Sequence, residues 1–238
     1  MNKTIDILNL GFKNYQQTYK IQKELVKKRH EGKISDTLIL VEHPPVFTIG
    51  KSGSKKNILA PFKKIKQEGI EIIEVDRGGD ITYHGPGQIV GYPIIDLKNY
   101  GKDIHLYLRM LEEVLIKLLD DFDIKAERIK GMTGVWVYPV RNKAPKATAS
   151  DEYRRISNGK KIASIGIGVS KWITYHGFAL NIAPDMGHFA MINPCGLGKG
   201  VTSMKEQLDS KCPPQNKIEE KLVESFTEVF SKRNISIV

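Results

Sequence analysis

The apolar residues of this chain of 238 residues fall mainly into short runs of strand length, and these runs constrain its fold more than any other feature. Runs of four to eight apolar residues bounded by Gly, Pro or polar clusters are typical of buried strands. On this pattern we expect strands at residues 4–10, 37–41, 46–49, 70–75, 89–97, 133–138, 162–169 and 173–182.

Helical periodicity appears between these runs at irregular intervals. A basic helix is predicted over 15–31, and Asp103 is a good N-cap for a second helix that runs to about residue 121. Ser203 and Glu206 fit a capping box, and Asn216 is expected to cap the last helix. The inward faces are predicted to consist of Ile104, Leu108, Leu111, Leu115, Leu118 and Leu119 in the second helix and Ile218, Leu222, Val223, Phe226, Val229 and Phe230 in the last.

Because strands and helices do not alternate strictly, the pattern favours an α+β fold over a doubly wound one. We expect one domain spanning 1–238, with an inserted loop or hairpin at the polar, basic stretch 139–159. The longest apolar runs are far below the roughly 18 residues that a membrane span needs. The N-terminus has no apolar signal core, so a cytoplasmic location is expected. In that reducing compartment Cys195 and Cys212 should be free thiols.

The net charge of +10 is unevenly spread. Residues 141–171 carry eight basic and two acidic side chains, and residues 51–66 carry six lysines and no acid. Basic surfaces attract anionic partners, so nucleic acid and an acidic carrier protein are candidates beside a merely solvated basic face. A nucleic-acid-binding surface should interleave aromatic residues with its cations, yet Tyr153 is the one aromatic residue in 139–160. We therefore expect no nucleic-acid partner.

Three segments have compositions typical of a site: 77–88, 160–181 and 192–200. The first is rich in glycine but lacks the phosphate-binding pattern G-x-x-x-x-G-K-[ST]. In the second, Lys161 precedes a strand with small residues that leave room for a ligand against the backbone. In the third, Cys195 lies between Pro194 and Gly196 in a predicted turn, where it is reactive only if a cation or N–H dipoles favour its thiolate. Cys212 has no comparable setting.

The histidines give no sign of a metal site. His43, His84, His105 and His176 are scattered, and no Cys/His pair has the spacing of metal ligands, so neither a metal nor another cofactor is expected. His84 and His176 compete with Lys161 for the role of base, because histidine is the commoner partner of a nucleophilic cysteine.

Together the three segments resemble the lipoyl(octanoyl) transferase family. The stretches that carry the resemblance are RGGDITYHGPGQIVGYPIIDL (77–97), KIASIGIGVSKWITYHGFALNI (161–182) and INPCG (192–196), with support from HPPVFTIGK (43–51) and TGVWV (133–137). The family implies a biotin/lipoate protein ligase-like catalytic domain, a mixed sheet flanked by helices with the acyl chain in a tunnel. It also implies an acyltransferase that moves octanoyl from octanoyl-acyl carrier protein to a lysine of a lipoyl domain. Its acceptors are the lipoyl domains of 2-oxoacid dehydrogenase complexes and the glycine cleavage H protein.

The resemblance assigns roles residue by residue. The nucleophile falls on Cys195, which would carry the acyl group as a thioester, and the residue that lowers its pKa falls on Lys161. His176 is a possible lining residue, and we expect the enzyme to be a monomer. The substrate-binding residues implied by the family are Arg77, Gly78, Gly79, Asp80, Ile81, Thr82, Tyr83, His84, Ser164, Ile165, Gly166, Gly177, Phe178 and Ala179. Backbone N–H groups near Gly78, Gly79 or Gly196 are candidates for stabilising the oxyanion.

The chain departs from the family pattern at Asp80, where Gln is commoner, in the cationic run 197–200, and in the length of 139–159. Two enzymatic alternatives stay open: an ATP-dependent lipoate or biotin protein ligase, and an octanoyl amidotransferase that takes its acyl group from another lipoyl domain. ATP dependence and donor competition would separate them. A cysteine protease has no support beyond Cys195 and the scattered histidines.

Overall fold

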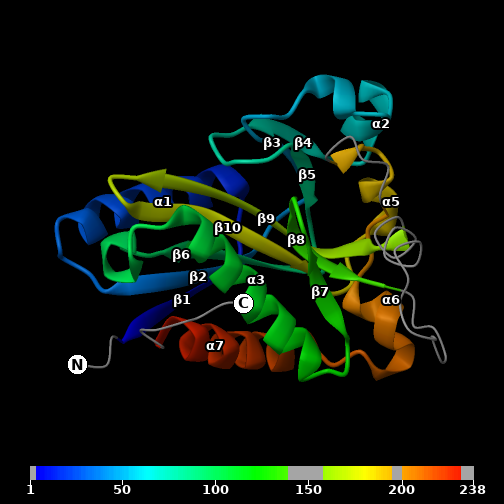
Figure 1. The fold of residues 1–238 in the computed structure, drawn as a ribbon. Coiled ribbons are helices and arrows are strands. Elements are labelled where there is room, and N and C mark those ends of the chain that lie inside the picture. The colour runs from blue at the N-terminus through cyan, green and yellow to red at the C-terminus, as the bar shows by residue number, and fades with distance from the viewer. Residues whose placement is uncertain (1–3, 139–157, 195–199, 232–238) are drawn as a thin grey trace.

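The computed structural model describes residues 4–138, 158–194 and 200–231. Within these residues the strands form one large and one small sheet, with helices on both faces of the large one (Figure 1). The predicted insertion at 139–159 lies almost wholly outside the described residues. In spatial order, the seven strands of the large sheet are β1 (Ile5–Phe12), β2 (Asp36–Glu42), β6 (Gln88–Ile94), β10 (Ile173–Asn181), β9 (Lys160–Ser170), β8 (Met132–Val137) and β7 (Ala126–Ile129).

The large sheet is mixed, as predicted. β1 and β2 run parallel, and the remaining neighbouring pairs are antiparallel. Its central strands are covered on both faces, which explains the continuous apolar run at 37–41. Leu38 and Leu40 face one core, whereas Ile39 and Val41 face the other.

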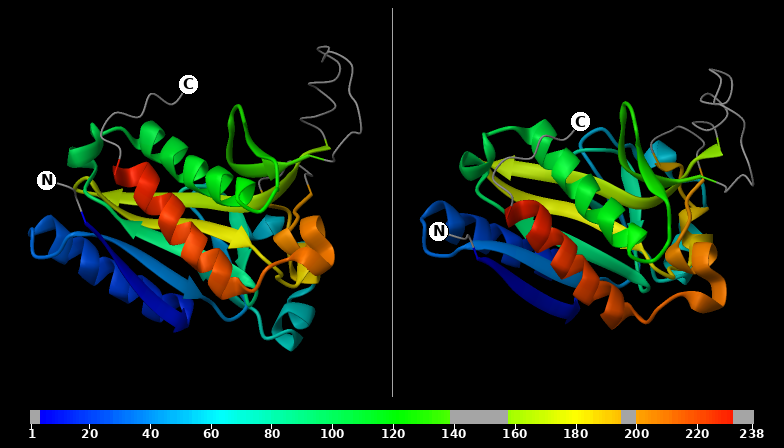
Figure 2. Two further views of the ribbon diagram at one scale, coloured as in Figure 1. Left: turned by 90° about the horizontal axis from the view of Figure 1, so that it is seen from below. Right: turned by 60° about the horizontal axis from the view of Figure 1, so that its bottom comes forward.

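Helices α3 (Ile104–Asp120) and α7 (Gln215–Ser231) lie side by side across one face of the large sheet (Figure 2). Helix α1 (Tyr15–His30) covers the opposite face, where Tyr15 and Val26 pack on Ile39, Val90 and Tyr92. The α+β fold of a mixed sheet flanked by helices is therefore confirmed.

The long helices confirm most of the expected faces and correct some details. Asp103 caps α3 by accepting hydrogen bonds from the backbone N–H groups of His105 and Leu106 at 2.8 and 3.0 Å. The predicted inward face of α3 was wrong at Ile104, which is 40% exposed, because the buried stripe is centred further along, on Leu111 and its neighbours one and two turns later. Leu108 is only partly buried.

Helix α7 begins two residues earlier than the predicted cap implies. Gln215 is its first residue, and Pro214 accepts hydrogen bonds from the backbone N–H groups of Lys217 and Ile218, so Asn216 lies inside the helix and does not cap it. Of its six predicted inward residues, Val223 is only partly buried. Ser203 caps a short helix α6 (Met204–Leu208) as expected, its hydroxyl accepting from the backbone N–H of Glu206.

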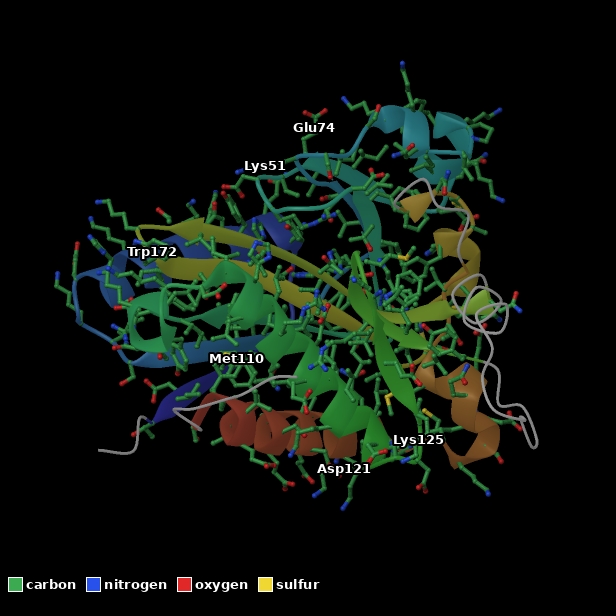
Figure 3. All side chains as sticks on the ribbon, in the orientation of Figure 1. Lys51, Glu74, Met110, Asp121, Lys125 and Trp172 are labelled. Atoms are coloured by element: carbon green, nitrogen blue, oxygen red, sulfur yellow. The ribbon has the colours of Figure 1, made fainter. Side chains whose placement is uncertain are left out.

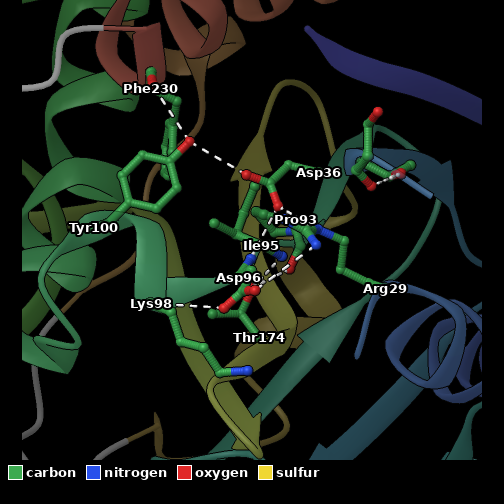
Figure 4. Close-up of polar contacts among 11 residues, drawn as sticks. Arg29, Asp36, Pro93, Ile95, Asp96, Lys98, Tyr100, Thr174 and Phe230 are labelled. Carbon is green, nitrogen blue, oxygen red and sulfur yellow. Dashed lines mark hydrogen bonds and ion pairs between the residues drawn. The ribbon is translucent and has the colours of Figure 1, made fainter. Parts of the chain in front are cut away.

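A polar cluster joins β2, α1, α7 and the 3₁₀ turn after β6 at one end of the large sheet (Figure 4). Asp36 on β2 accepts hydrogen bonds from Arg29 of α1 at 2.7 Å and from the backbone N–H of Asp96 at 3.0 Å. Tyr100, in the 3₁₀ turn η2 (Leu97–Tyr100), contacts both Asp36 and the carbonyl of Phe230 in α7 at 3.4 Å. These contacts satisfy a buried carboxylate and tie the helices of both faces to the sheet.

The small sheet, with spatial order β4 (Glu71–Glu74), β3 (Val46–Ile49) and β5 (Ile81–His84), packs at the side of the large sheet. It has its own apolar core, in which Phe47, Ile65, Tyr83 and Phe189 are buried. A turn at residues 85–87 connects β5 directly to β6, and so joins the two sheets. The described elements not expected from the sequence are short: η1 (Lys55–Asn57), α2 (Phe62–Gln67), β5, β7, η2, α5 (Met186–Phe189) and η4 (Asp209–Lys211).

Candidate functional site

A pocket of about 220 Å³ opens where β9 and β10 of the large sheet meet the loop that leads into β5 of the small one. It gathers residues from segments that are far apart in the chain. Its lining includes most of the predicted substrate-binding residues: Arg77, Gly79, Asp80, Ile81, Thr82, His84, Ser164, Ile165, Gly166, Gly177, Phe178 and Ala179, together with Lys161 and His176.

Small residues make the floor of the pocket. Gly177 and Ala179 on β10 are in register with Gly166 and Ser164 on β9, so all four share one face of the sheet. A Cβ on Gly166 would lie 2.7 Å from the carbonyl oxygen of Gly78, so the loop rests directly on this strand. The missing side chain at Gly166 therefore makes room for the backbone of the loop that borders the pocket.

The glycine-rich loop is held in place by Arg77. Its guanidinium donates to the carbonyl of Thr48 at 2.7 Å and to the hydroxyl of the same residue at 2.9 Å, which ties the loop to β3. The N–H of Gly78 donates to the carbonyl of Ile167 at 2.8 Å. Because that N–H is engaged in the sheet contact, the expectation that Gly78 supplies an oxyanion donor was wrong.

Two of the predicted substrate-binding residues do not line the pocket. Gly78 lies against β9, as described above. Tyr83 points into the core of the small sheet, where its hydroxyl contacts Nδ1 of His188 at 2.9 Å and its ring packs edge-on against Phe189. Alternation along β5 explains this difference, because Thr82 and His84 face the pocket and Tyr83 between them faces away.

Asp80, the departure from the family pattern, has a defined partner. Its two carboxylate oxygens accept hydrogen bonds from the side-chain amide of Asn57 at 2.9 and 2.7 Å, and Oδ1 also accepts from the backbone N–H of Ile81 at 2.6 Å. The carboxylate therefore connects the pocket loop to η1.

Two buried tyrosines that line the pocket, Tyr15 and Tyr92, were not predicted, nor was the buried His43 that contacts them. His43 donates from Nδ1 to the carbonyl of Lys13 at 2.6 Å, so its Nε2 accepts from the hydroxyl of Tyr92 at 2.8 Å. Tyr92 and Tyr15 line the pocket, and the ring of Tyr15 stacks on that of His84. No local spacing connects these residues, although a polar His43 at the end of a buried strand, before two prolines, was a signal that could have been used.

His176 occupies a strained position in β10. Its φ of +54° is rare for a residue other than glycine. Three hydrogen bonds hold the residue in this strained conformation. Its N–H donates to the side chain of Gln22 at 2.7 Å, its Nε2 to Asp76 at 2.8 Å, and its Nδ1 accepts from Tyr15 at 3.3 Å. A chain of hydrogen bonds thus runs from Asp76 to the pocket wall.

Burial controls the ionisation of these groups. It lowers the pKa of His43 to about 4, although the contact with the carbonyl of Lys13 opposes the shift. It also lowers the pKa of His176 to about 4 against the opposing effect of Asp76, and it lowers the pKa of His84 well below the ordinary value of a histidine. For Asp76, partial burial opposes ionisation, but hydrogen bonds from His176, Tyr175 and Tyr19 outweigh it and lower the pKa to about 2. The three histidines are therefore neutral at neutral pH.

Lys161 contributes a cation at the other side of the pocket. Its Nζ lies 4.7 Å from the centre of the Trp136 ring, in the range of a cation–π contact. Gly134 leaves room for this side chain: it has a φ of +120°, and a Cβ there would lie 2.7 Å from the carbonyl of Ala163 and 3.4 Å from Cε of Lys161. Four more residues line the pocket from this side: Thr133 and Trp136, which belong to the TGVWV stretch noted in the sequence, and Gly131 and Met132, which the sequence did not single out.

Cys195 lies outside the described residues, but both flanks of its segment are described. Pro194 lines the pocket. On the other side, the carbonyl of Gly200 accepts from the backbone N–H of Lys161 at 2.9 Å, and the N–H of Thr202 donates to the carbonyl of Lys161 at 2.9 Å. Cys212 is partly exposed, belongs to neither the pocket nor its loops, and has a thiol pKa raised by burial.

The described residues 4–138, 158–194 and 200–231 contain no group of three or more His, Cys, Asp or Glu side chains that could hold a metal ion. In the same part of the chain, no helix combines the length and apolar character needed to cross a bilayer.

Comparison with known proteins gives a consistent result. Residues 14–227 match the family described as the lipoyl protein ligase A/B catalytic domain. An octanoyltransferase of Christiangramia forsetii is 42% identical over 242 residues, which cover 97% of each chain. An octanoyltransferase of Flavobacterium psychrophilum is 41% identical, covering 97% of this chain and 98% of that protein.

Solved structures share the fold at much lower identity. A bipartite lipoate protein ligase of Thermoplasma acidophilum superposes with a TM-score of 0.69 at 15% identity, covering 94% of this chain and 83% of that one. A putative lipoate protein ligase of the same organism with bound lipoic acid gives 0.66 at 14% identity, covering 94% and 85%.

Proposed function

The chain belongs to the octanoyltransferases of the lipoyl protein ligase A/B catalytic-domain family, and from that premise we propose that it moves octanoyl through a thioester on Cys195. The donor is octanoyl-acyl carrier protein. The acceptor is a lysine of the lipoyl domains of 2-oxoacid dehydrogenase complexes and of the glycine cleavage H protein. The enzyme works in the cytoplasm as a monomer, and it begins the endogenous synthesis of protein-bound lipoate.

One observation carries the proposal: the Lys161 cation lines a pocket floored by small residues, and Lys161 contacts the chain on the far side of the cysteine segment. Pro194, next to Cys195, lines the same pocket. This arrangement supports a Cys195 thiolate that attacks the donor thioester beside a pocket that holds the acyl chain. A nearby ammonium lowers the pKa of a thiol by favouring its charged form.

The chemistry proceeds in two balanced steps. The Cys195 thiolate attacks the donor thioester, the carrier thiolate leaves, and one thioester replaces another at little thermodynamic cost. The amine of the acceptor lysine then attacks the acyl-enzyme, an amide forms, a proton leaves the nitrogen, and Cys195 is released as thiolate. Splitting the transfer in this way allows the two protein substrates to bind in turn.

The electrostatics of the site favour Lys161 over the histidines as partner of the thiol. His84 and His176 are neutral at neutral pH because burial lowers their pKa values, so neither supplies a cation. A base whose pKa is about 4 is also a weak proton acceptor near pH 7. We assign the Lys161 ammonium to stabilise the Cys195 thiolate and to give a proton to the departing carrier thiolate, so that the neutral Lys161 amine then takes up the proton of the incoming amine. We assign His176 to hold Tyr15 in the pocket wall.

The residues that line the pocket indicate where the acyl chain binds. The acyl chain lies over Ser164, Gly166, Gly177 and Ala179, the small residues of β9 and β10 that line the pocket. The family relatives that are about 40% identical are octanoyltransferases, whereas the ligases on this fold are near 15%, which supports transfer from a thioester over ATP-dependent ligation.

The test is transfer in the absence of ATP. The protein is incubated with octanoyl-acyl carrier protein and an unmodified lipoyl domain, and the lipoyl domain is weighed by intact mass spectrometry. We expect octanoylation without nucleotide, which disappears when the acceptor lysine is changed to arginine. Octanoylation that requires free octanoate and ATP would replace this account with the ligase, and transfer only from an octanoylated lipoyl domain would replace it with the amidotransferase.

A further inference from the structure

The exposed surface around η1 and α2 combines lysines with apolar side chains. Residues 51–66 contain six lysines and no acidic residue. Each of the six is exposed, and Lys55 pairs with Glu74 at 2.9 Å. Leu59 and Phe62 lie among them and are each 62% exposed. We call this the η1–α2 surface; it comprises Lys51, Lys55, Lys56, Leu59, Phe62, Lys63, Lys64 and Lys66.

Within the described residues, Leu59 and Phe62 belong to none of the three apolar cores and are not among the partly buried residues packed against them. Ile65 alone among the residues of α2 is buried, and it anchors the helix to the core of the small sheet. The other side chains of α2 point to solvent. Figure 3 shows this end of the molecule, with Lys51 and Glu74 labelled. Exposed apolar residues framed by charge are typical of a protein-binding surface.

The backbone and Asn57 side chain beneath the η1–α2 surface are hydrogen-bonded to the pocket loop and to the segment that leads to Pro194. The side chain of Asn57 donates to Asp80 in the pocket loop. The carbonyl of Asn57 accepts from the N–H of Asn193 at 2.8 Å, and the N–H of Leu59 donates to the carbonyl of Met191 at 2.8 Å. The backbone beneath Leu59 is thus paired with the segment that leads through Pro194 to Cys195.

We propose that the η1–α2 surface docks the acyl donor, a carrier protein that presents an amphipathic acidic helix. This proposal rests on the proposed function, because it names the surface by which that function receives its thioester. An amphipathic helix of this kind would pack its apolar stripe on Leu59 and Phe62. The carboxylates that border the stripe would then lie beside the surrounding lysines. Docking here places the carrier beside the chain that holds Cys195, so its acyl-bearing arm enters the pocket over Asp80.

The test compares two variants of equal net charge. Lys56→Glu/Lys63→Glu/Lys66→Glu reverses the η1–α2 surface. Lys98→Glu/Lys211→Glu/Lys217→Glu reverses three exposed lysines outside it. The rate of self-acylation is measured by intact mass spectrometry with two donors, octanoyl-acyl carrier protein and the small thioester octanoyl-N-acetylcysteamine, which has no surface to dock. A further variant, Leu59→Ser/Phe62→Ser, removes the apolar pair without changing charge.

We expect the second-order rate constant with the carrier donor to fall about tenfold or more in the first variant and less than threefold in the control. The small thioester should react within twofold of wild type in both. The serine variant should slow only the carrier reaction.

Three results would overturn the proposal. Equal loss in the two charge variants would mean that net charge alone guides the carrier. An unchanged carrier reaction with impaired transfer to the lipoyl domain would assign the surface to the acceptor. Loss with both donors would mean that the substitutions perturb the pocket. Failure of wild type to be acylated by either donor would instead refute the proposed function itself.

Discussion

Acid should destabilise this protein well above the pH at which its carboxylates titrate, because His43 and His176 are buried as neutral rings. Both are at most 1% exposed, and burial lowers the pKa of each to about 4. An unfolded histidine has a pKa of about 6.5, so between these values the unfolded chain binds more protons than the folded one. The stability is fully present above the unfolded pKa and is lost as the pH falls toward the folded value.

The magnitude follows from proton linkage. Moving from about pH 7.5 to about pH 5 should cost about 2 kcal/mol for each of the two rings, or about 4 kcal/mol together. Asp76 adds nothing in this window, because its stabilising contribution is lost only as the pH falls from its ordinary value to about 2. His84 acts in the same direction as the other histidines.

The assay is urea unfolding at the two pH values for wild type, His43→Gln and the exposed control His30→Gln. His43→Gln should be less stable at the higher pH, yet its loss on acidification should be smaller than that of wild type by about 2 kcal/mol. The control should behave like wild type. A wild-type loss below about 1 kcal/mol, or the same pH dependence in His43→Gln as in wild type, would refute the reasoning that these rings are held neutral by burial.

Three further predictions concern the site. Lys161→Met should keep apolar contact with Trp136 but lose the ammonium, so self-acylation near neutral pH should fall at least about tenfold and continue to rise toward alkaline pH; a profile equal to that of wild type would remove Lys161 from thiol activation. Gly134→Ala should lower the free energy of unfolding by about 2 kcal/mol, because a Cβ would lie 2.7 Å from the carbonyl of Ala163 at a φ of +120°; a loss below about 0.5 kcal/mol in denaturant melts would contradict this. Raising salt from about 20 to about 500 mM should lower kcat/KM with the carrier donor but not with a small thioester; a flat profile with both would exclude electrostatic docking.

The large elements of the fold were predictable because their signals are long and periodic. Helix α3 repeats its apolar residues over 17 positions, and the paired strands β9 and β10 follow each other through a short turn. Helix α2 and strand β7 are six and four residues long, too short for periodicity to separate them from a loop. Strand β5 lies inside a segment whose glycines and proline indicate a loop.

The site was predictable where its residues share a motif. The loop at 77–84 and the strands from Lys161 to Ala179 are continuous stretches of sequence, and the structure brings them together around one pocket. Tyr15, His43 and Tyr92 come from three separate segments, and only the tertiary fold makes them neighbours. The side to which Tyr83 points depended on recognising β5 as a strand, because alternation assigns faces only once a strand is known.

The central claim is that Cys195 carries the octanoyl group, and intact mass spectrometry tests it most directly. Wild type, Cys195→Ser and Cys212→Ser are each incubated with octanoyl-acyl carrier protein and weighed without acceptor. The account predicts a gain of about 126 Da, one octanoyl group, in wild type and Cys212→Ser and none in Cys195→Ser. An adduct that persists in Cys195→Ser, or that disappears in Cys212→Ser, would contradict it.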